Sequence, residues 1–418
     1  MNQKNIIYPF QSENKSYGKL LVKVNNEMSK KPVENATVRI YNMKNQSKIL
    51  EETQTNISGQ TLVIELLAPP VYYSMEPYDV LPYEPYILQI SAPDFQTVEI
   101  YGTQIFPEVL AIQPVNLSHA SNTIDTKKII IGAHTLSGYY PPSVVTEIEK
   151  EIINTDEPVI IPDHLIVHTG IPSDTIVPNL CTGYKDYIKN VVSNEIYPTW
   201  PIETIYANIF ATLSFTLNRF YTNWYPGQGY DFNITDTNVF DNKWIYGRNY
   251  YDNISNIVDS FFYYYLSKPG ITQPLLTPYC KGALIKCRNM MEKWISKDLG
   301  TDGYQAINIL RYFFGESLYL NSTNNNAGVS YLWPGVELSI GFSGDAITII
   351  QDYLNNIATV YPEIPVNKSN GIYSKTTEEA VKVYQRIFSL PITGKVDVGT
   401  WYSIMLFFNK YNNTVLRC

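Results

Sequence analysis

The stretch at residues 187–201, YIKNVVSNEIYPTWP, is the most informative part of the chain. Its apolar side chains recur three and four residues apart, which predicts a helix with one apolar face, and Glu195 falls on that face. Pro198 and Pro201 end the helix just beyond Glu195, because a residue before proline avoids the helical region. Burial on the apolar face and the negative pole of the helix C-terminus are both expected to raise the pKa of the Glu195 carboxyl.

Glu195 is therefore a candidate general acid, since cleavage of a glycosidic bond requires a carboxyl that keeps its proton near neutral pH. Tyr197, Trp200 and Trp224 follow closely and would supply a stacking wall for sugar rings. A structural interpretation stands beside this one, in which Glu195 binds a backbone amide or an arginine and Trp200 belongs to the core. The pattern alone leaves both open, because unusual carboxylates only sometimes mark a site.

Around this helix the chain predicts a multidomain α+β protein. Residues 1–115 alternate between apolar and polar positions and are broken by turn signals, which predicts an N-terminal antiparallel β-sandwich. Residues 116–157 are polar, then acidic, and predict an exposed linker open to proteolysis. Residues 158–335 predict a mainly helical α+β domain, and residues 336–418 a small domain of three amphipathic helices.

The second of those three helices has its own start signal. Thr376 and Glu379 have the spacing of a capping box, so the helix is predicted to open at Thr376. Four apolar positions follow at helical spacing and predict its buried stripe: Ala380, Val383, Tyr384 and Ile387.

Composition excludes several classes of function. The 418 residues carry a formal net charge of −8, and no basic stripe is present, so we expect no nucleic-acid partner. No apolar run approaches the ~18 residues of a membrane span. The first residues, MNQKNIIYPFQSENKSYG, hold no apolar core of a secretory signal. We therefore expect a protein that acts where it is made or is enclosed there.

Cysteines and histidines are the remaining chemically notable residues. Four cysteines are too few for a disulfide scaffold, and Cys280 and Cys287 are predicted to be isolated buried thiols rather than a zinc site. His164 and His168 belong to a predicted strand, HLIVH, where residues four apart lie ~13 Å from each other. We predict that both histidines are satisfied or exposed rather than metal ligands.

Two separated segments resemble one known family. Residues 187–217 align without a gap to the opening of the stage II sporulation protein D/LytB-type domain, and the segment MEKW at 291–294 resembles its closing pattern. The resemblance covers about residues 163–320. It implies a lytic transglycosylase that cleaves peptidoglycan glycan strands, with Glu195 as catalytic acid and then base. An internal sugar hydroxyl attacks in that reaction, so one carboxyl suffices, whereas a hydrolase needs a second carboxylate. The nearby carboxylates have no alignment-backed claim to that second role: Asp186, Glu203, Asp231 and Asp236.

The two outer parts of the chain carry further resemblances. Residues 371–401 are similar to peptidoglycan-binding type 1 domains, and residues 17–115 to carboxypeptidase-regulatory or transthyretin-like modules. The order of the parts resembles germination-specific spore cortex-lytic enzymes. That order implies a zymogen located in the cortex or coat region of the spore, with cortex peptidoglycan and an activating germination protease as partners. It also implies no cofactor.

Departures from the family pattern limit what is carried over. Leu213 stands at the family's arginine, which makes bidentate contacts that leucine cannot make. Residues 236–241 hold no His or Cys where some relatives bind a metal, so we predict no metal. The predicted substrate contacts are Trp200, Tyr197, Asn208, at the family's glutamine, and Tyr279. Two alternatives remain open: a non-catalytic peptidoglycan-binding scaffold, and a hydrolytic muramidase.

Overall fold

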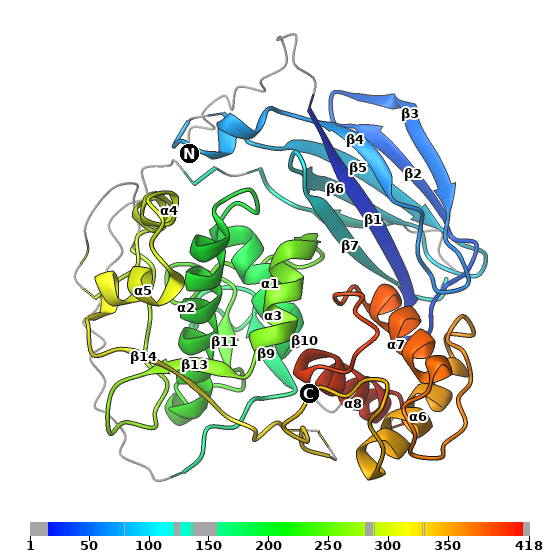
Figure 1. Cartoon of the computed structure of the whole chain (residues 1–418). Coiled ribbons are helices and arrows are strands. Elements are labelled where there is room, and N and C mark those ends of the chain that lie inside the picture. Colours follow the sequence, from blue (N-terminus) through cyan, green and yellow to red (C-terminus); the bar gives the residue numbers. More distant parts are fainter. Residues whose placement is uncertain are drawn as a thin grey trace.

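The computed structural model describes residues 16–412 except 79, 121–125, 134, 137–156, 281–286, 288, 328 and 330. This part of the chain has a mixed α+β fold, as the sequence predicts. Figure 1 shows an N-terminal sandwich (residues 16–130), a helical central unit (157–327) and a C-terminal unit (331–412) that lies below the sandwich. The finer domain borders given above stay predictions.

The N-terminal sandwich is built from two sheets, with orders β12-β7-β1-β4 and β3-β2-β5-β6-β8. Alternation explains the first strand, because Leu20, Val22 and Val24 are fully buried and the side chains between them are less so. A short 3-10 helix, η1 (Val71–Ser74), connects two strands. The strands of the sandwich itself are β1 (Ser16–Asn26), β2 (Thr37–Asn42), β3 (Asn45–Gln54), β4 (Ile64–Ala68), β5 (Glu84–Ser91), β6 (Val98–Ile105), β7 (Leu110–Leu117) and β8 (Lys127–Ile130).

Two strand pairs correct the expectation of a purely antiparallel sandwich. β1 pairs with β7 in parallel, and so does β6 with β8. β8 lies inside the segment predicted as linker, so part of that segment is a strand of the sandwich, while residues 137–156 lie outside the described part. Alternation predicts that a segment is a strand, but it does not say which strand becomes its neighbour.

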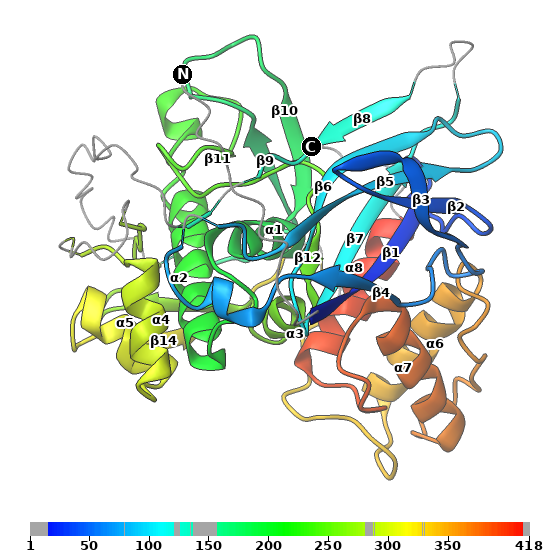
Figure 2. The same cartoon turned by 90° about the horizontal axis from the view of Figure 1, so that it is seen from above.

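The central unit adds a strand to the sandwich. β12 (Tyr250–Tyr251) pairs antiparallel with β7, with Tyr251 opposite Ala111, and Figure 2 shows the two side by side. The two units therefore share one sheet rather than meeting only through side chains.

The central unit itself is mostly helical around two small sheets. One sheet has the order β10-β9-β11 and the other pairs β13 with β14. The first helix ends at Glu195, as predicted, with Ile196 as its C-cap. The elements are β9 (His164–His168), β10 (Asn179–Gly183), α1 (Tyr184–Glu195), α2 (Ile202–Tyr221), η2 (Pro226–Gln228), β11 (Ile234–Thr235), α3 (Asp252–Phe261), β13 (Tyr264–Ser267), α4 (Lys293–Thr301), α5 (Ala306–Phe314) and β14 (Tyr319–Ser322).

The C-terminal unit contains the three predicted helices, α6 (Asp345–Ala358), α7 (Lys375–Phe388) and α8 (Val398–Asn412). The predicted start of α7 is wrong: its N-cap is Ser374, whose side chain accepts from the backbone N–H of Thr377. A serine two residues earlier thus caps the helix, and it satisfies the N–H of Thr377 rather than that of Glu379, which a capping box at Thr376 would satisfy. The predicted apolar stripe faces inward, with Tyr384 fully buried.

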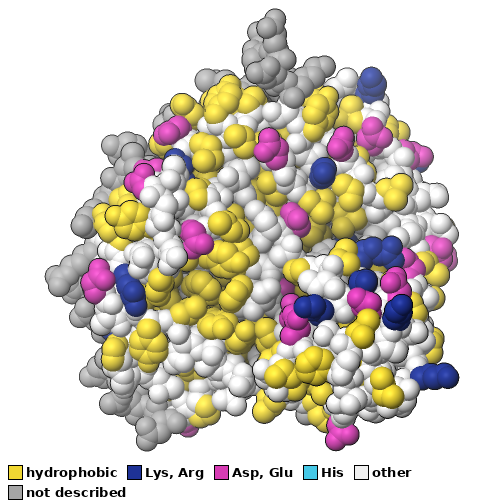
Figure 3. Space-filling view, in the orientation of Figure 1, with side chains coloured by type: hydrophobic (Ala, Val, Ile, Leu, Met, Phe, Trp, Pro, Cys, Tyr) yellow, Lys and Arg dark blue, Asp and Glu magenta, His cyan; other side chains and the backbone are white. Residues whose placement is uncertain are grey.

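Charged and hydrophobic side chains are distributed differently over the face drawn in Figure 3. Figure 3 shows hydrophobic side chains gathered where α2 lies, while Lys, Arg, Asp and Glu are mixed over the C-terminal unit. None of the helices in the described ranges combines the length and the apolar character needed to cross a lipid bilayer.

A buried ion cluster joins α1 to α3. The carboxylate of Asp259, on α3, pairs with Lys185 at 2.9 Å and with Lys189 at 2.6 Å, both on the first turns of α1. Burial disfavours the charged form of Asp259, but the two lysines outweigh it and lower its pKa to about 2. Removing the carboxylate would leave two partly or fully buried ammonium groups without their partner.

Asp259→Asn is expected to lower the unfolding free energy by about 3–5 kcal/mol, because it breaks a buried charge network on one side only. Denaturant unfolding of the full chain measures this change. Glu337→Gln is the matched control: Glu337 pairs with Lys395 at 2.8 Å and both side chains are exposed, so the loss should stay within about 1 kcal/mol. Equal losses in both variants would contradict the assignment.

The same network should make the unfolding free energy depend on pH in the acidic range. The pKa of Asp259 is 3.8 when unperturbed and about 2 in the fold, so between these values the unfolded chain binds more protons. The contribution is complete above pH 4 and is lost as the pH falls toward 2. Wild type should therefore lose more stability than Asp259→Asn over this window, measured by unfolding at each pH.

Candidate functional site

Glu195 is buried at the end of α1, with 3% of its surface exposed. Its Oε1 accepts a hydrogen bond from the backbone N–H of Lys243 at 2.8 Å, and its Oε2 pairs with the ammonium of Lys293. The predicted burial is confirmed, and the backbone amide of the structural interpretation is present as well. Both donors stabilise a negatively charged carboxylate, which opposes the effect of burial on which the prediction of a protonated acid rested.

Lys293 is a residue that the sequence interpretation missed. It is the first residue of α4, and its ammonium also lies 5.3 Å from the centre of the Tyr279 ring, within cation–π range. The signal was present, because Lys293 is the third residue of the MEKW segment that resembles the family's closing pattern.

The residues that follow Glu195 along the chain contribute to an aromatic cluster. The ring centres of Tyr197 and Trp200 are 5.5 Å apart, and Trp294 lies 5.1 Å from Trp200. Trp224 does not join them as predicted: it follows the opposite end of α2, whose 20 residues span ~30 Å, and it packs on Arg219. Trp294, from the second family-like segment, takes the place that Trp224 was expected to have.

The aromatic cluster is covered by other parts of the chain. The indole N–H of Trp200 donates to the carbonyl of Ser74 at 2.8 Å, from η1 of the N-terminal sandwich. Leu136, beyond β8, donates its N–H to the Tyr197 hydroxyl at 2.8 Å, and its carbonyl accepts from the indole N–H of Trp294 at 3.1 Å. In this state the predicted stacking wall is therefore buried.

Arg248 is a second residue that the sequence interpretation missed. Its guanidinium donates to Asn194 at 2.7 Å and to the Ser193 carbonyl, both in the last turn of α1, and to Gln104 of β6 at 2.9 Å. Burial lowers the pKa of Arg248, and nearby tyrosines and Glu195 act in the opposite direction. The group thus fastens the N-terminal sandwich beside Glu195.

Asn208 and Tyr279 are the other two predicted substrate contacts. Asn208 is fully buried on α2, where its amide donates to Thr204 at 2.8 Å and to Ser296 at 3.1 Å. The Tyr279 hydroxyl donates to the Asn208 carbonyl at 3.3 Å, and burial raises the pKa of that phenol. Asn208 joins α2 to α4, and Tyr279 faces Lys293, so only Tyr279 reaches the immediate surroundings of Glu195.

Leu213 is fully buried in the hydrophobic core. Its position on α2 therefore contributes packing and offers no polar group to a substrate. The cationic groups beside Glu195 come from other elements, Lys293 of α4 and Arg248 before β12.

The loop at 236–241 is organised by hydrogen bonds. Asp241 accepts from Arg219 at 2.9 Å, from the Tyr225 hydroxyl at 2.6 Å and from the Thr235 N–H at 2.8 Å. Within the described ranges, no group of three His, Cys, Asp or Glu side chains has the arrangement of a metal site.

Two of the nearby carboxylates and one of the two strand histidines have hydrogen-bond partners. Glu203 accepts from the Ala306 N–H at 2.7 Å, and Asp231 accepts from Asn179 at 2.9 Å. His168 is buried, bonded to Asn179 at 2.8 Å and to the Ile171 carbonyl at 3.0 Å, as predicted for a satisfied histidine.

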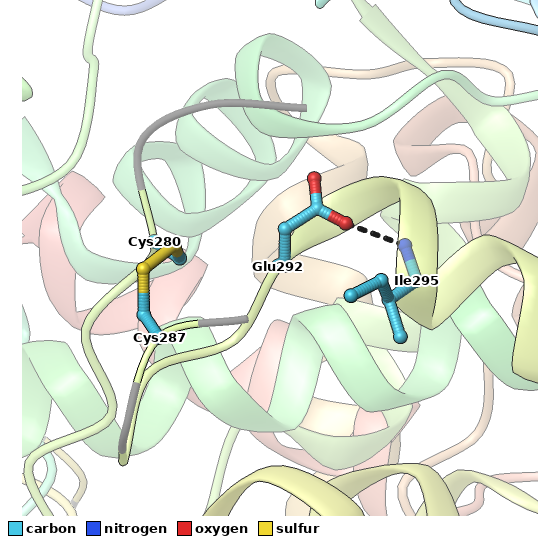
Figure 4. The surroundings of a disulfide bond; sticks show 4 residues. All are labelled: Cys280, Cys287, Glu292 and Ile295. Atoms are coloured by element: carbon cyan, nitrogen blue, oxygen red, sulfur yellow. Dashed lines mark hydrogen bonds between the residues drawn. A yellow bond between two sulfur atoms is a disulfide. The ribbon is translucent and has the colours of Figure 1, made fainter. Parts of the chain in front are cut away.

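The prediction of isolated thiols at Cys280 and Cys287 is wrong. The two form a disulfide with Cα atoms 5.8 Å apart, shown in Figure 4 beside Glu292, whose carboxylate caps α4 through the Ile295 N–H. Backbone pairing between Tyr279 and Met291 brings the two sides of this loop together. The disulfide therefore closes a loop whose two arms carry Tyr279 and Lys293. Cys181 is also disulfide-bonded.

Comparison with known families identifies one part of the chain. Residues 343–404, which include α6, α7 and the first part of α8, match the family described as "Putative peptidoglycan binding domain". The C-terminal unit is therefore similar to peptidoglycan-binding domains. This agrees with the resemblance found in the sequence and supports peptidoglycan as a partner of the protein.

The remaining comparisons are partial. No curated protein matches the chain. The N-terminal domain of SleB is 21% identical with a TM-score of 0.16, covering 18% of this chain and 97% of that one. GBS52, the minor pilin of Streptococcus agalactiae, is 13% identical with a TM-score of 0.19, over 26% and 47%. 3-Chlorocatechol 1,2-dioxygenase from Rhodococcus opacus 1CP is 9% identical with a TM-score of 0.17, over 28% and 66%.

Proposed function

We propose that the protein is the zymogen of a spore cortex-lytic transglycosylase that cleaves the bond between N-acetylmuramic acid and N-acetylglucosamine during germination. The observation that carries the proposal is the place of Glu195, buried beside Tyr279 and an aromatic cluster in a chain that also holds a peptidoglycan-binding domain. The resemblance to the sporulation protein D/LytB-type domain supports the reaction. The order of the units, similar to that of the cortex-lytic enzyme SleC, supports the spore cortex as the substrate.

In the proposed reaction Glu195 gives its proton to the glycosidic oxygen. The bond between that oxygen and C1 of N-acetylmuramic acid breaks, and its electron pair stays on the leaving oxygen. Glu195, now a carboxylate, takes the proton of the sugar's C6 hydroxyl while the C6 oxygen bonds to C1. The product is a 1,6-anhydro sugar, no water is consumed, and Glu195 regains its proton.

The contacts of the N-terminal sandwich support an inactive precursor. The sandwich contributes Ser74 over Trp200 and Gln104 against Arg248, and Leu136 beyond it lies on Tyr197 and Trp294. A glycan strand has no access to the aromatic cluster while these contacts stand. Release of the sandwich is therefore the step that an activating germination protease would permit.

The sandwich also contacts the peptidoglycan-binding domain. Lys23 and Gln60 both donate to the carbonyl of Ile387, at the end of α7, at 3.0 and 2.5 Å. Ser58 donates to Glu363 at 2.5 Å. One N-terminal unit thus holds both of the others, so its departure after a single cut would free both.

Disulfides persist where the surroundings are oxidising. The pair at Cys280 and Cys287 therefore supports a place outside a reducing cytosol, such as the cortex or coat region of a spore.

Cutting the chain within residues 137–156 is expected to activate it. The intact and the cut chain are compared on purified cortex sacculi, with soluble muropeptides measured by mass spectrometry. The cut chain should release them at least tenfold faster, because the sandwich no longer covers Tyr197 and Trp200. Equal rates would contradict the zymogen.

Glu195→Gln keeps the shape of the side chain but removes the acid, and the cut variant should lose at least about a hundredfold in rate. Glu203→Gln is the matched control, since Glu203 bonds the Ala306 N–H and has no part in the proposed reaction. Retained release of anhydro-muropeptides by Glu195→Gln would exclude Glu195 as the acid. Products heavier by one water would instead indicate a muramidase.

A non-catalytic peptidoglycan-binding scaffold is the second candidate. Both oxygens of Glu195 have donors, and Leu213 leaves the position of the family's arginine apolar. Binding of the cut chain to sacculi without any soluble muropeptide would favour this function.

A further inference from the structure

The two donors to Glu195 differ in mobility. The N–H of Lys243 belongs to the backbone, so Oε1 is held by a group fixed in the chain. The ammonium of Lys293 stands at the end of a flexible side chain that keeps 18% of its surface exposed, and it holds Oε2. Of these two partners, Lys293 is the one that can leave without moving the main chain.

Lys293 also occupies a place suited to a sugar. Its ammonium lies over the Tyr279 ring, 5.3 Å from the centre. An aromatic face that attracts a cation can also stack a sugar ring when a glycan binds. A glycan that packs on Tyr279 would therefore displace the ammonium from the ring and from Oε2 together.

We propose that Lys293 is a positioning residue, which orients Glu195 through Oε2 before a glycan binds and withdraws when a glycan enters, so that Oε2 is the oxygen that donates the proton. The inference rests on the proposed function. An oxygen that accepts a hydrogen bond from an ammonium group carries no proton to donate, so Lys293 must leave Oε2 before Glu195 can act as an acid. Oε1 cannot take this role because it stays bound to the backbone N–H of Lys243.

The other groups around Glu195 do not replace Lys293 in this role. Arg248 is charged and close enough to influence Glu195, but it is held by Asn194 and Gln104. Tyr187 and Tyr279 also face the carboxyl, and burial raises the pKa of both phenols, which keeps them neutral. The charge that changes its position is therefore that of Lys293.

The test is the pH dependence of muropeptide release by the full chain after cutting in the linker. In Lys293→Met, loss of the ammonium favours the protonated carboxyl, so the pH at which half the activity is lost on the alkaline side should rise by about one unit or more. The turnover number should fall, because Glu195 loses its orientation, while KM should not rise. Lys293→Arg keeps the charge and should keep the wild-type profile.

Lys297→Met is the control, because it removes a lysine one turn further along α4 that pairs with Asp298 instead. It should leave the pH profile unchanged. Thermal unfolding checks that each variant folds. If Lys293→Met does not fold, Lys293→Gln replaces it, and the same shift of the pH profile is expected. An unshifted profile in Lys293→Met or Lys293→Gln, or an equal shift in Lys297→Met, would overturn the inference.

Failure of this inference and failure of the proposed function give different results. If Glu195→Gln stays active, the proposed function of Glu195 is lost, whatever Lys293 does. If Glu195→Gln is inactive and the Lys293→Met profile is unshifted, only the role of Lys293 is lost.

Discussion

A buried arginine, Arg248, fastens the N-terminal sandwich to the last turn of α1, and the arrangement around Glu195 depends on it. Its guanidinium has acceptors on both sides, Asn194 and the Ser193 carbonyl in α1 and Gln104 in β6. A buried cation is tolerated only where such partners exist, and separating the units would leave it short of one of them. The end of α1 and the sandwich are therefore held as one structure.

The three units share their interior as well as these polar contacts. One continuous hydrophobic cluster includes side chains of all three, and β12 extends a sheet of the sandwich. The charged network of Asp259, Lys185 and Lys189 lies where α1 meets α3, and Lys23 of the sandwich is close enough to interact with it. Burial, opposed in part by Asp259, lowers the pKa of Lys23 to about 7. The surroundings of Glu195 are therefore buried by ordinary interior packing between the units rather than by a separate plug.

Local patterns predicted much of the secondary structure and part of the candidate site. The spacing of apolar residues predicted α1, the strand at 164–168 and the three C-terminal helices. The prolines at 198 and 201 predicted that α1 ends near Glu195. The pairing of strands and of cysteines could not be predicted in the same way. The parallel partners of β1 and β6, and the disulfide between Cys280 and Cys287, depend on which segments meet after folding, and neither alternation nor cysteine spacing encodes that.

The sequence by itself determined that Glu195 would be buried at a helix end and that a peptidoglycan-binding unit would close the chain, because both depend on residues near one another along the chain. Only the tertiary structure decided what touches the carboxyl. Lys243 lies 48 residues and Lys293 98 residues from Glu195. Lys293 reaches the carboxyl because α1 and α4 both pack against α2, and Lys243 reaches it from the segment between β11 and β12. A charge that arrives through such packing leaves no local signal in the sequence.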